Sequence, residues 1–160
     1  MTFDNSRTII SLRIKLFAAT IVLLTYLAMA YVIRLIKFPF LGLSDSAWTI
    51  ILTGIWVILA FMPMVLNYQF FSYSDEGDCI IIRYFTAGIV GGKKNSFEIN
   101  KTTFSGYKIK SSFFGIIQSL VLFQKVQGGV ATYPPVYISA LSKDEKAKVK
   151  KSLNLYNTPL

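Results

Sequence analysis

The densest group of chemically capable side chains is the acidic stretch Asp75-Glu76-Gly77-Asp78, which Cys79 follows directly. Paired carboxylates can serve as general acid and base, and suitably spaced ones can bind Ca²⁺. Catalytic carboxylates face each other across a cleft, and a calcium loop needs spaced oxygen ligands that end in a bidentate glutamate. Neither pattern is present here. We therefore interpret the stretch as a tight turn between two strands.

The chain has no histidine, and Cys79 is its one cysteine. This composition excludes histidine-based acid–base catalysis, Ser-His-Asp and Cys-His nucleophile pairs, His-ligated metal sites and an internal disulfide. With no histidine to activate it, Cys79 is expected to be a buried, inert thiol at the start of a strand. The sequence thus predicts a protein that is not an enzyme, with no catalytic residues, no metal site and no cofactor.

A glycine-rich stretch, residues 87–94 (AGIVGGKK), has a composition close to that of a phosphate-binding loop. A nucleotide P-loop needs glycine where Ala87 stands, serine or threonine where Lys94 stands, and a helix afterwards. Two interpretations remain. The stretch is a solvated hairpin loop, or Lys93 and Lys94 contact lipid phosphates, where each basic residue adds about 1 kcal/mol near an anionic leaflet. Lys108 and Lys110 would complete such a basic face.

The formal net charge is +9, from 17 Lys and Arg against 8 Asp and Glu. The basic residues are thinly spread, and Asp144 and Glu145 interrupt their closest cluster near the C-terminus. A nucleic-acid partner is therefore not expected, and a nearby anionic membrane is the simpler use of the charge.

Two long apolar runs precede most of these polar residues in the chain. The chain is 53% hydrophobic, with mean hydropathy +0.50, which is too apolar for a water-soluble protein of 160 residues. Leu16 to Ile33 are 18 uncharged residues, about 27 Å of helix, and Ala47 to Leu66 form the apolar part of a second uncharged run. We predict two transmembrane helices, at about 16–36 and 47–67, in a hairpin that fills residues 16–67.

Two alternatives concern the first run. It could be a cleaved signal peptide, with Ala28-Met29-Ala30 as the cleavage site, although hydrophobicity continues beyond that site. Residues 1–15 are expected to be a cytoplasmic or interfacial N-terminal segment. Within it, residues 9–15 form either a short interfacial helix or the start of the first span.

The short connection between the spans places both termini on the same side. Arg7, Arg13 and Lys15 precede the first span, against Arg34 and Lys37 in the connection. The excess of basic residues favours cytoplasmic termini and an integral protein of the plasma or inner membrane.

The connection also contains the apolar stretch Phe38-Pro39-Phe40-Leu41-Gly42-Leu43. Such a stretch is not expected to project into water alone, because exposed apolar patches usually mark an interface. We therefore expect Phe38, Pro39, Phe40 and Leu41 to contact a protein partner or the bilayer interface.

Residues 68–160 have the pattern of a small β domain that ends in a helix. Ser142 and Glu145 form a capping box, and Val149 and Leu153 follow at helical spacing, so a helix is expected at 142–154. Pro134-Pro135 should place the last strand at an edge or bend it. Six strands are predicted, at 68–74, 79–86, 96–100, 103–109, 117–126 and 130–138.

This layout resembles the pleckstrin-homology-like domains of bacterial membrane proteins, in which one or two membrane helices often precede the β domain. The resemblance rests on the order of elements, on FFSYSDEGDCIIIRYF after the hairpin, and on YPPVYISALSKDEKAKVKK leading into the last helix. The family has seven strands, so a further strand is expected in residues 87–95 or 111–115. The resemblance implies a small β barrel or sandwich that acts as a scaffold, and it carries over no catalytic residues.

Together these observations predict a non-enzymatic, membrane-anchored accessory or scaffold protein. Its β domain would bind a partner protein as a subunit of a larger membrane assembly. The alternative is a sensor of anionic lipid that uses Lys93, Lys94, Lys108 and Lys110.

Overall fold

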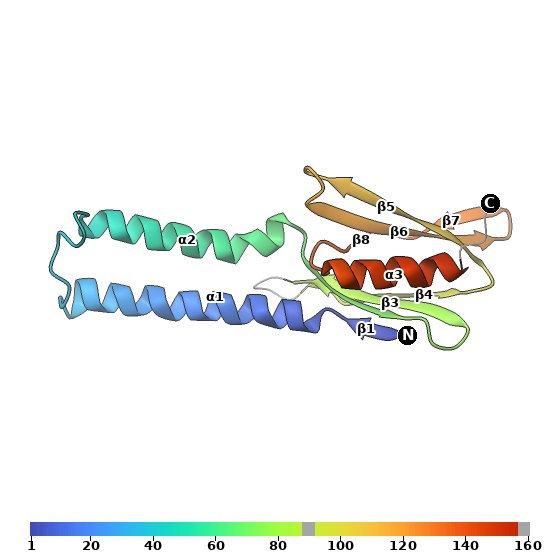
Figure 1. The fold of residues 1–160 in the computed structure, drawn as a ribbon, viewed down its shortest axis with the longest axis horizontal. Helices are drawn as coiled ribbons and strands as arrows, with labels where there is room; N and C mark the ends of the chain where they lie inside the picture. Colours follow the sequence, from blue (N-terminus) through green and yellow to red (C-terminus); the bar gives the residue numbers. More distant parts are fainter. Residues whose placement is uncertain (88–91, 157–160) are drawn as a thin grey trace. The chain divides into compact units, whose positions relative to one another are not determined.

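The computed structural model describes residues 1–87 and 92–156. The chain divides into two compact units, which are described separately. The β unit comprises Met1–Ile9 and Pro63–Leu160, and the helix unit comprises residues 10–62. Figure 1 labels the helices and strands along the chain.

The helix unit is built from two long apolar helices. Helix α1 (Ser6–Leu27) continues through one π-helical stretch, η1 (Ala28–Val32), and α2 covers Asp45–Val65. Both are long and apolar enough to cross a membrane, and only 6% of the most apolar stretch of each is buried. Their large aliphatic and aromatic side chains are therefore mostly exposed or only half-buried.

Hydrogen bonds between side chains join the two helices. The Trp56 indole N–H donates to Thr20 Oγ1 at 2.8 Å. The hydroxyls of Tyr26 and Tyr31 both lie within hydrogen-bond distance of Thr49 Oγ1, at 3.1 and 2.7 Å. Hydroxyl and indole groups that would otherwise be unpaired in an apolar environment are thus satisfied between the helices.

The ends of α2 follow known capping chemistry. At its start, Ser44 Oγ accepts a hydrogen bond from the Ala47 amide at 3.3 Å. At its end, Asn67 takes a left-handed φ of 50°, its amide donates to the Met64 carbonyl, and the Tyr68 amide donates to the Pro63 carbonyl. This pair of hydrogen bonds is a Schellman motif, which stops the helix directly before the first strand that follows.

The predicted spans and the observed helices overlap but have different bounds. The first helix begins at Ser6 rather than near residue 16, and residues 9–15 belong to it without interruption. The separate interfacial helix is therefore not present. Asn5 explains the early start, because its carbonyl accepts the first helical hydrogen bond from the Ile9 amide and its backbone is held by Phe71.

The β unit contains two antiparallel sheets in its described residues. The first has the order β1-β2-β3-β4, and the second has the order β5-β6-β7 with β8 also paired to β6. Their bounds are β1 Thr2–Asp4, β2 Gln69–Ser74, β3 Cys79–Thr86, β4 Asn95–Asn100, β5 Phe104–Ser112, β6 Ile117–Val126, β7 Gly129–Thr132 and β8 Val136–Tyr137.

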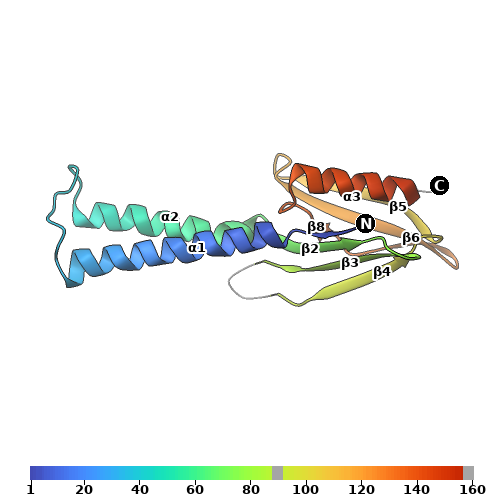
Figure 2. The ribbon, with the colours of Figure 1, turned by 60° about the horizontal axis from the view of Figure 1, so that its bottom comes forward.

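Strand β1 lies outside the predicted β domain. Thr2, Phe3 and Asp4 pair with Ser74, Tyr73 and Ser72 of β2, so the first sheet begins before the helix unit and resumes after it (Figure 2). Residues 1–15, expected as a cytoplasmic or interfacial N-terminal segment, are therefore divided between a strand and the start of α1. Three residues whose partners lie about 70 positions away carry too little local pattern to reveal a strand.

Seven strands follow the helix unit in the described residues, rather than the predicted six. The extra strand comes from the predicted 130–138 run, which Pro134-Pro135 divides into β7 and β8, as residues without an N–H donor should. Of the two places named for a hidden strand, Ser111 and Ser112 extend β5. The other place, 87–95, lies partly outside the described residues, and its last residue begins β4.

The core of the β unit lies between the two sheets and helix α3 (Lys143–Tyr156). Both bonds of the predicted capping box are present: the Glu145 amide donates to Ser142 Oγ, and the Ser142 amide donates to Glu145 Oε2. Val149 and Leu153 are 2% and 0% exposed and pack into a core made of Phe71, Tyr73, Ile80, Ile82, Ile99, Phe104, Leu120, Leu122, Val136, Ile138 and Leu141.

Candidate functional site

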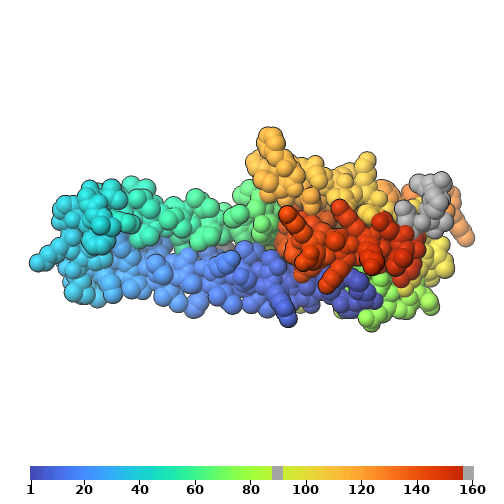
Figure 3. Space-filling view, in the orientation of Figure 1, coloured from blue at the N-terminus to red at the C-terminus, as the bar shows by residue number. Residues whose placement is uncertain are grey.

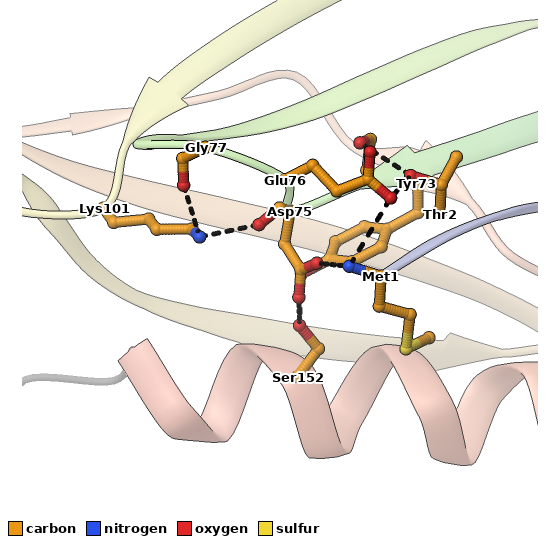
Figure 4. Close-up of polar contacts among 9 residues, drawn as sticks. Met1, Thr2, Tyr73, Asp75, Glu76, Gly77, Lys101 and Ser152 are labelled. Carbon is orange, nitrogen blue, oxygen red and sulfur yellow. Dashed lines mark hydrogen bonds and ion pairs between the residues drawn. The ribbon is translucent and has the colours of Figure 1, made fainter.

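The acidic turn between β2 and β3 holds the densest polar network of the β unit (Figure 4). The α-amino group of Met1 forms an ion pair with the Asp75 carboxylate, whose other oxygen accepts a hydrogen bond from the Ser152 hydroxyl on α3. Thr2 Oγ1 donates to Glu76 Oε1 at 2.8 Å. Segments from the start, middle and end of the chain therefore meet at one carboxylate.

A buried hydroxyl chain runs from this carboxylate into the core. Tyr73 OH and Ser152 Oγ are 2.7 Å apart, and the single proton of Ser152 goes to Asp75. Tyr73 must therefore be the donor to Ser152. Burial raises the pKa of Tyr73 to about 12, with the hydrogen bond to Ser152 opposing that shift and the Asp75 charge adding to it. The phenol remains a neutral donor at physiological pH.

The Asp75 carboxyl is kept ionised by its partners. Burial alone would raise its pKa, but the hydrogen bonds from the Met1 amino group and Ser152, together with the charges of that amino group and Lys101, lower it overall. Lys101 Nζ also donates to the Asp75 and Gly77 carbonyls, at 2.6 and 2.7 Å, and lies 4.6 Å from the centre of the Tyr156 ring. Every group in the network thus has a structural partner.

The arrangement explains the acidic stretch without catalysis. Glu76, Gly77 and Asp78 form an exposed turn, as predicted, with Gly77 at a left-handed φ of 72°. No group of three or more potential metal ligands occurs in residues 1–87 and 92–156. Cys79 begins β3 as predicted, but it is half-buried rather than buried. A hydrogen bond to Glu98 raises the pKa of its thiol, with smaller contributions from burial and Asp78, so the thiol stays protonated.

The four lysines predicted to contact phosphates are all exposed. Lys93 and Lys94 precede β4 in the first sheet, whereas Lys108 and Lys110 lie on the solvent face of β5 in the second, opposite the half-buried Tyr107 and Ile109. Ion pairs among the described residues are confined to the Met1 amino group with Asp75 and Glu76. None of the four lysines forms an ion pair within the described residues. Gly88 to Gly91 of the glycine-rich stretch lie outside the described residues.

The apolar connection of the helix unit forms an ordered turn. Phe40 and Leu43 exchange two backbone hydrogen bonds of 3.1 Å, and Leu41 and Gly42 between them have φ of 52° and 77°. The Trp48 indole N–H donates to the Phe40 carbonyl at 3.0 Å. The turn leaves Phe40 and Leu41 50% and 77% exposed, while Phe38 is half-buried and Pro39 is exposed.

A second exposed apolar turn was missed in the sequence. Between β5 and β6, Phe113, Phe114 and Ile116 are 66%, 102% and 50% exposed. The signal that could have found it is the pair of adjacent phenylalanines between Ser112 and Gly115, because a hairpin turn normally carries polar residues.

No family model matches the chain, and neither a curated protein nor a solved structure is similar to it. Its function is therefore argued from its own residues.

Proposed function

We propose that this chain is a non-enzymatic membrane protein in which the helix unit anchors the β unit. The observation that carries the proposal is the pair of apolar helices, 27 and 21 residues long, whose apolar surfaces are uncovered. At 1.5 Å per residue both exceed the roughly 30 Å of a hydrocarbon core. The excess of basic residues near the start of the first helix (Arg7, Arg13 and Lys15) over the two between the helices (Arg34 and Lys37) favours termini in the cytoplasm.

The sheet pairing supports a hairpin topology for these helices. Strand β1 enters α1 and α2 leads into β2, and the two strands pair over Thr2–Asp4. A chain that leaves the β unit and returns to it must cross a bilayer an even number of times. Two crossings, with both ends on the cytoplasmic side, meet that condition.

The β unit supports the proposed pleckstrin-homology-like class. A four-stranded antiparallel sheet, a second sheet, and a C-terminal helix packed against the core follow the layout of that class, with the helix unit inserted between β1 and β2. Such domains act as interaction modules, and the two groups of the buried polar network whose pKa values are displaced, Asp75 and Tyr73, are occupied by structural hydrogen bonds. We therefore propose that the β unit is a scaffold in a larger membrane assembly.

The proposed contact with a protein partner is the turn that contains Phe38, Pro39, Phe40 and Leu41. Its hydrogen bonds hold Phe40 and Leu41 in exposed positions, and an ordered apolar turn loses little conformational entropy when a partner covers it.

The first experiment tests the membrane topology in the full chain. Leu41→Cys and Gln127→Cys are each made in a Cys79→Ser background and exposed to a membrane-impermeant maleimide in intact cells. Labelling of Leu41→Cys alone, with Gln127→Cys labelled only after permeabilisation, is expected. Labelling of both positions, or release of the protein by alkaline carbonate, would refute the anchored hairpin.

The second experiment tests the partner contact. Tagged full-length chain is purified from its own membranes in a mild detergent, beside Phe38→Ala/Phe40→Ala and the control Phe17→Ala/Phe61→Ala. The control removes two exposed rings, 68% and 52% accessible, from the helices of the same unit. A stoichiometric protein should remain with the wild type and the control but leave the first variant. Equal recovery with all three chains excludes the turn as the contact.

Lipid binding by Lys93, Lys94, Lys108 and Lys110 is the second candidate, favoured by their exposure and lack of ion-pair partners. It predicts that full-length protein in nanodiscs enriches anionic lipid around itself, and that the enrichment falls with salt and with glutamine at these positions. A lipid composition unchanged by the four substitutions argues against it.

A further inference from the structure

The β5–β6 turn exposes three large apolar side chains in four residues. Phe114 is fully exposed to solvent, Phe113 is 66% exposed, and Ile116 is 50% exposed. The two phenylalanine rings contact only each other among the aromatic pairs of the described residues, edge to face with centres 6.3 Å apart. The turn stands out from the β unit as a protrusion in the space-filling view (Figure 3). Exposing this much apolar surface to water is unfavourable.

The backbone of this turn is strained at the two exposed phenylalanines. Phe113 and Phe114 have φ of 53° and 54°, and Gly115 has 86°, so three successive residues are left-handed. Glycine adopts this region freely, but a bulky side chain does so at an energetic cost. The Ile116 amide closes the turn on the Phe113 carbonyl at 3.1 Å. A strained turn that displays rings instead of burying them is a candidate for an interaction site.

Strand pairing places this turn at the end of the β unit where the chain leaves for the helices. Ser119 on β6 pairs with Tyr137 on β8, whose amide donates to Gln69 Oε1 at 3.0 Å. Gln69 begins β2, and its carbonyl accepts from the Asn5 side chain at 2.9 Å. The turn, two residues beyond Ser119 along β6, therefore lies at the end that holds both junctions, Asn5–Ser6 and Leu66–Gln69 (Figure 1).

Four lysines lie toward the same end of the β unit. On β5, Lys110 pairs with Ser119 near the turn, and Lys108 lies two residues further from it. Lys93 and Lys94 directly precede Asn95, the first residue of β4, which pairs with Tyr84. The acidic turn Asp75–Asp78 lies at the opposite end of β2. Of the acids at the start of α3, Glu145 is engaged by Ser142, and Lys143 and Lys146 flank Asp144. The end that carries the apolar turn is thus basic.

We propose that the β5–β6 turn is a second membrane anchor, which inserts Phe113, Phe114 and Ile116 into the interface of an anionic bilayer while Lys108 and Lys110 meet headgroup phosphates. The inference rests on the proposed function, because it needs the helices to cross that bilayer. Exposed rings flanked by lysines are the chemistry of an interfacial anchor. Leu66, the last apolar residue of the second run, is three residues from β2, which brings the surface within reach of this end.

The test uses full-length protein in nanodiscs that contain phosphatidylglycerol and phosphatidylcholine. In a Cys79→Ser background, single cysteines replace Phe114, Gln127 or Ile55, and each carries an environment-sensitive fluorophore. Gln127 is the matched control, since it is exposed in the turn at the other end of β6. Ile55 reports on α2, where it is 50% exposed. Lipids with a nitroxide near the headgroup or in mid-chain serve as quenchers.

The expected result is quenching of the Phe114→Cys probe by the shallow nitroxide, several-fold stronger than that of the Gln127→Cys probe. The quenching should weaken in pure phosphatidylcholine and in Lys108→Gln/Lys110→Gln. Because Phe114 makes no core contact, its replacement leaves the fold intact.

Two other outcomes separate the failures. An Ile55→Cys probe that the mid-chain nitroxide leaves unquenched would overturn the membrane anchoring itself. A quenched Ile55→Cys probe with an unquenched Phe114→Cys probe would overturn only the second anchor, and a blue shift without quenching would assign the turn to a protein partner instead.

Discussion

Ser152 on α3 donates a hydrogen bond to the carboxylate of Asp75, 77 residues earlier in the chain. That carboxylate also receives the Met1 amino group. One side chain therefore joins the closing helix, the first hairpin and the first strand. The same contact fixes the direction of the hydrogen bond from Tyr73, so the buried polar groups of this region form one ordered chain.

Asp75→Asn should destabilise the β unit by about 2 kcal/mol, because hydrogen bonds to a charged acceptor contribute on that order. The measurement is thermal unfolding of the full chain in detergent, followed by circular dichroism. Asp78→Asn is the control, since Asp78 is exposed in the same turn and the structure gives its carboxylate no hydrogen bond. Equal midpoints for the two variants would contradict a stabilising role for the Asp75 network.

The effect of Asp75 should depend on pH in a defined direction. Its pKa in the folded protein is lowered from 3.8, so its contribution to stability is complete above that value. The contribution is lost as pH falls through the lowered folded-state pKa. The gap in unfolding midpoint between wild type and Asp75→Asn should therefore be constant from pH 7 to pH 5 and narrow below about pH 4. A gap that widens on acidification would show that the charge is not the cause.

Asn5→Ala should weaken the attachment of the first strand. The buried Asn5 amide accepts from the Phe71 N–H and donates to the Gln69 carbonyl, both at 2.9 Å. Leaving two buried backbone groups unpaired costs about 3 kcal/mol. Hydrogen exchange of the Phe71 amide should accelerate, while that of Ile82 in the adjacent strand changes much less. Asn95→Ala, which removes one exposed contact of 3.4 Å, should leave both amides unchanged.

The β unit should fold without the helix unit only if β1 is kept. A fragment of residues 68–160 exposes the edge of β2, and open edges promote association between chains. Joining residues 1–5 to residue 68 by a short Gly-Ser linker restores the pairing, because Asn5 already contacts Gln69. Size-exclusion chromatography should find the linked protein monomeric and the plain fragment associated. Monomeric, equally stable forms of both would show that β1 is dispensable.

Two leucines of α3 provide a matched test of the core. Leu153 is 0% exposed in the core, and Leu155 is 74% exposed. Leu153→Ala should cost about 3 kcal/mol, from lost apolar burial and the cavity left behind, whereas Leu155→Ala should change stability by less than about 0.5 kcal/mol. Chemical unfolding of the linked protein provides the measurement. Similar midpoints would mean that α3 does not pack on the sheets.

Local patterns in the sequence predicted the elements that local chemistry specifies. The strands Cys79–Thr86 and Ile117–Val126 have the predicted bounds, because β-branched and aromatic runs end there at turn residues. The hydrogen bonds between Ser142 and Glu145 could be predicted because a capping box involves residues only three positions apart.

What escaped prediction depends on distant partners. Thr2–Asp4 is a strand only because β2 lies beside it, and Asp75 has its role only because Ser152 and Met1 reach it. The acidic turn already accounted for Asp75, so no neighbouring residue in the sequence indicated its contacts with Ser152 and Met1. The candidate sites follow the same division: the lysines and the Phe38–Leu41 turn were visible in the sequence, whereas the position of Phe113 and Phe114 at the helix-bearing end depends on strand register.

Because β1 precedes the helix unit and β2 follows it, the first sheet can close only after both helices have been synthesised. During synthesis Thr2–Asp4 leaves the ribosome before either helix and stays unpaired until Gln69–Ser74 has been made. In a bilayer, the two strands meet only when the second helix has returned the chain to its starting side. For the membrane anchor proposed above, closure of the first sheet would therefore report correct topology, and a chain with a misplaced helix would present an open β2 edge to proteases.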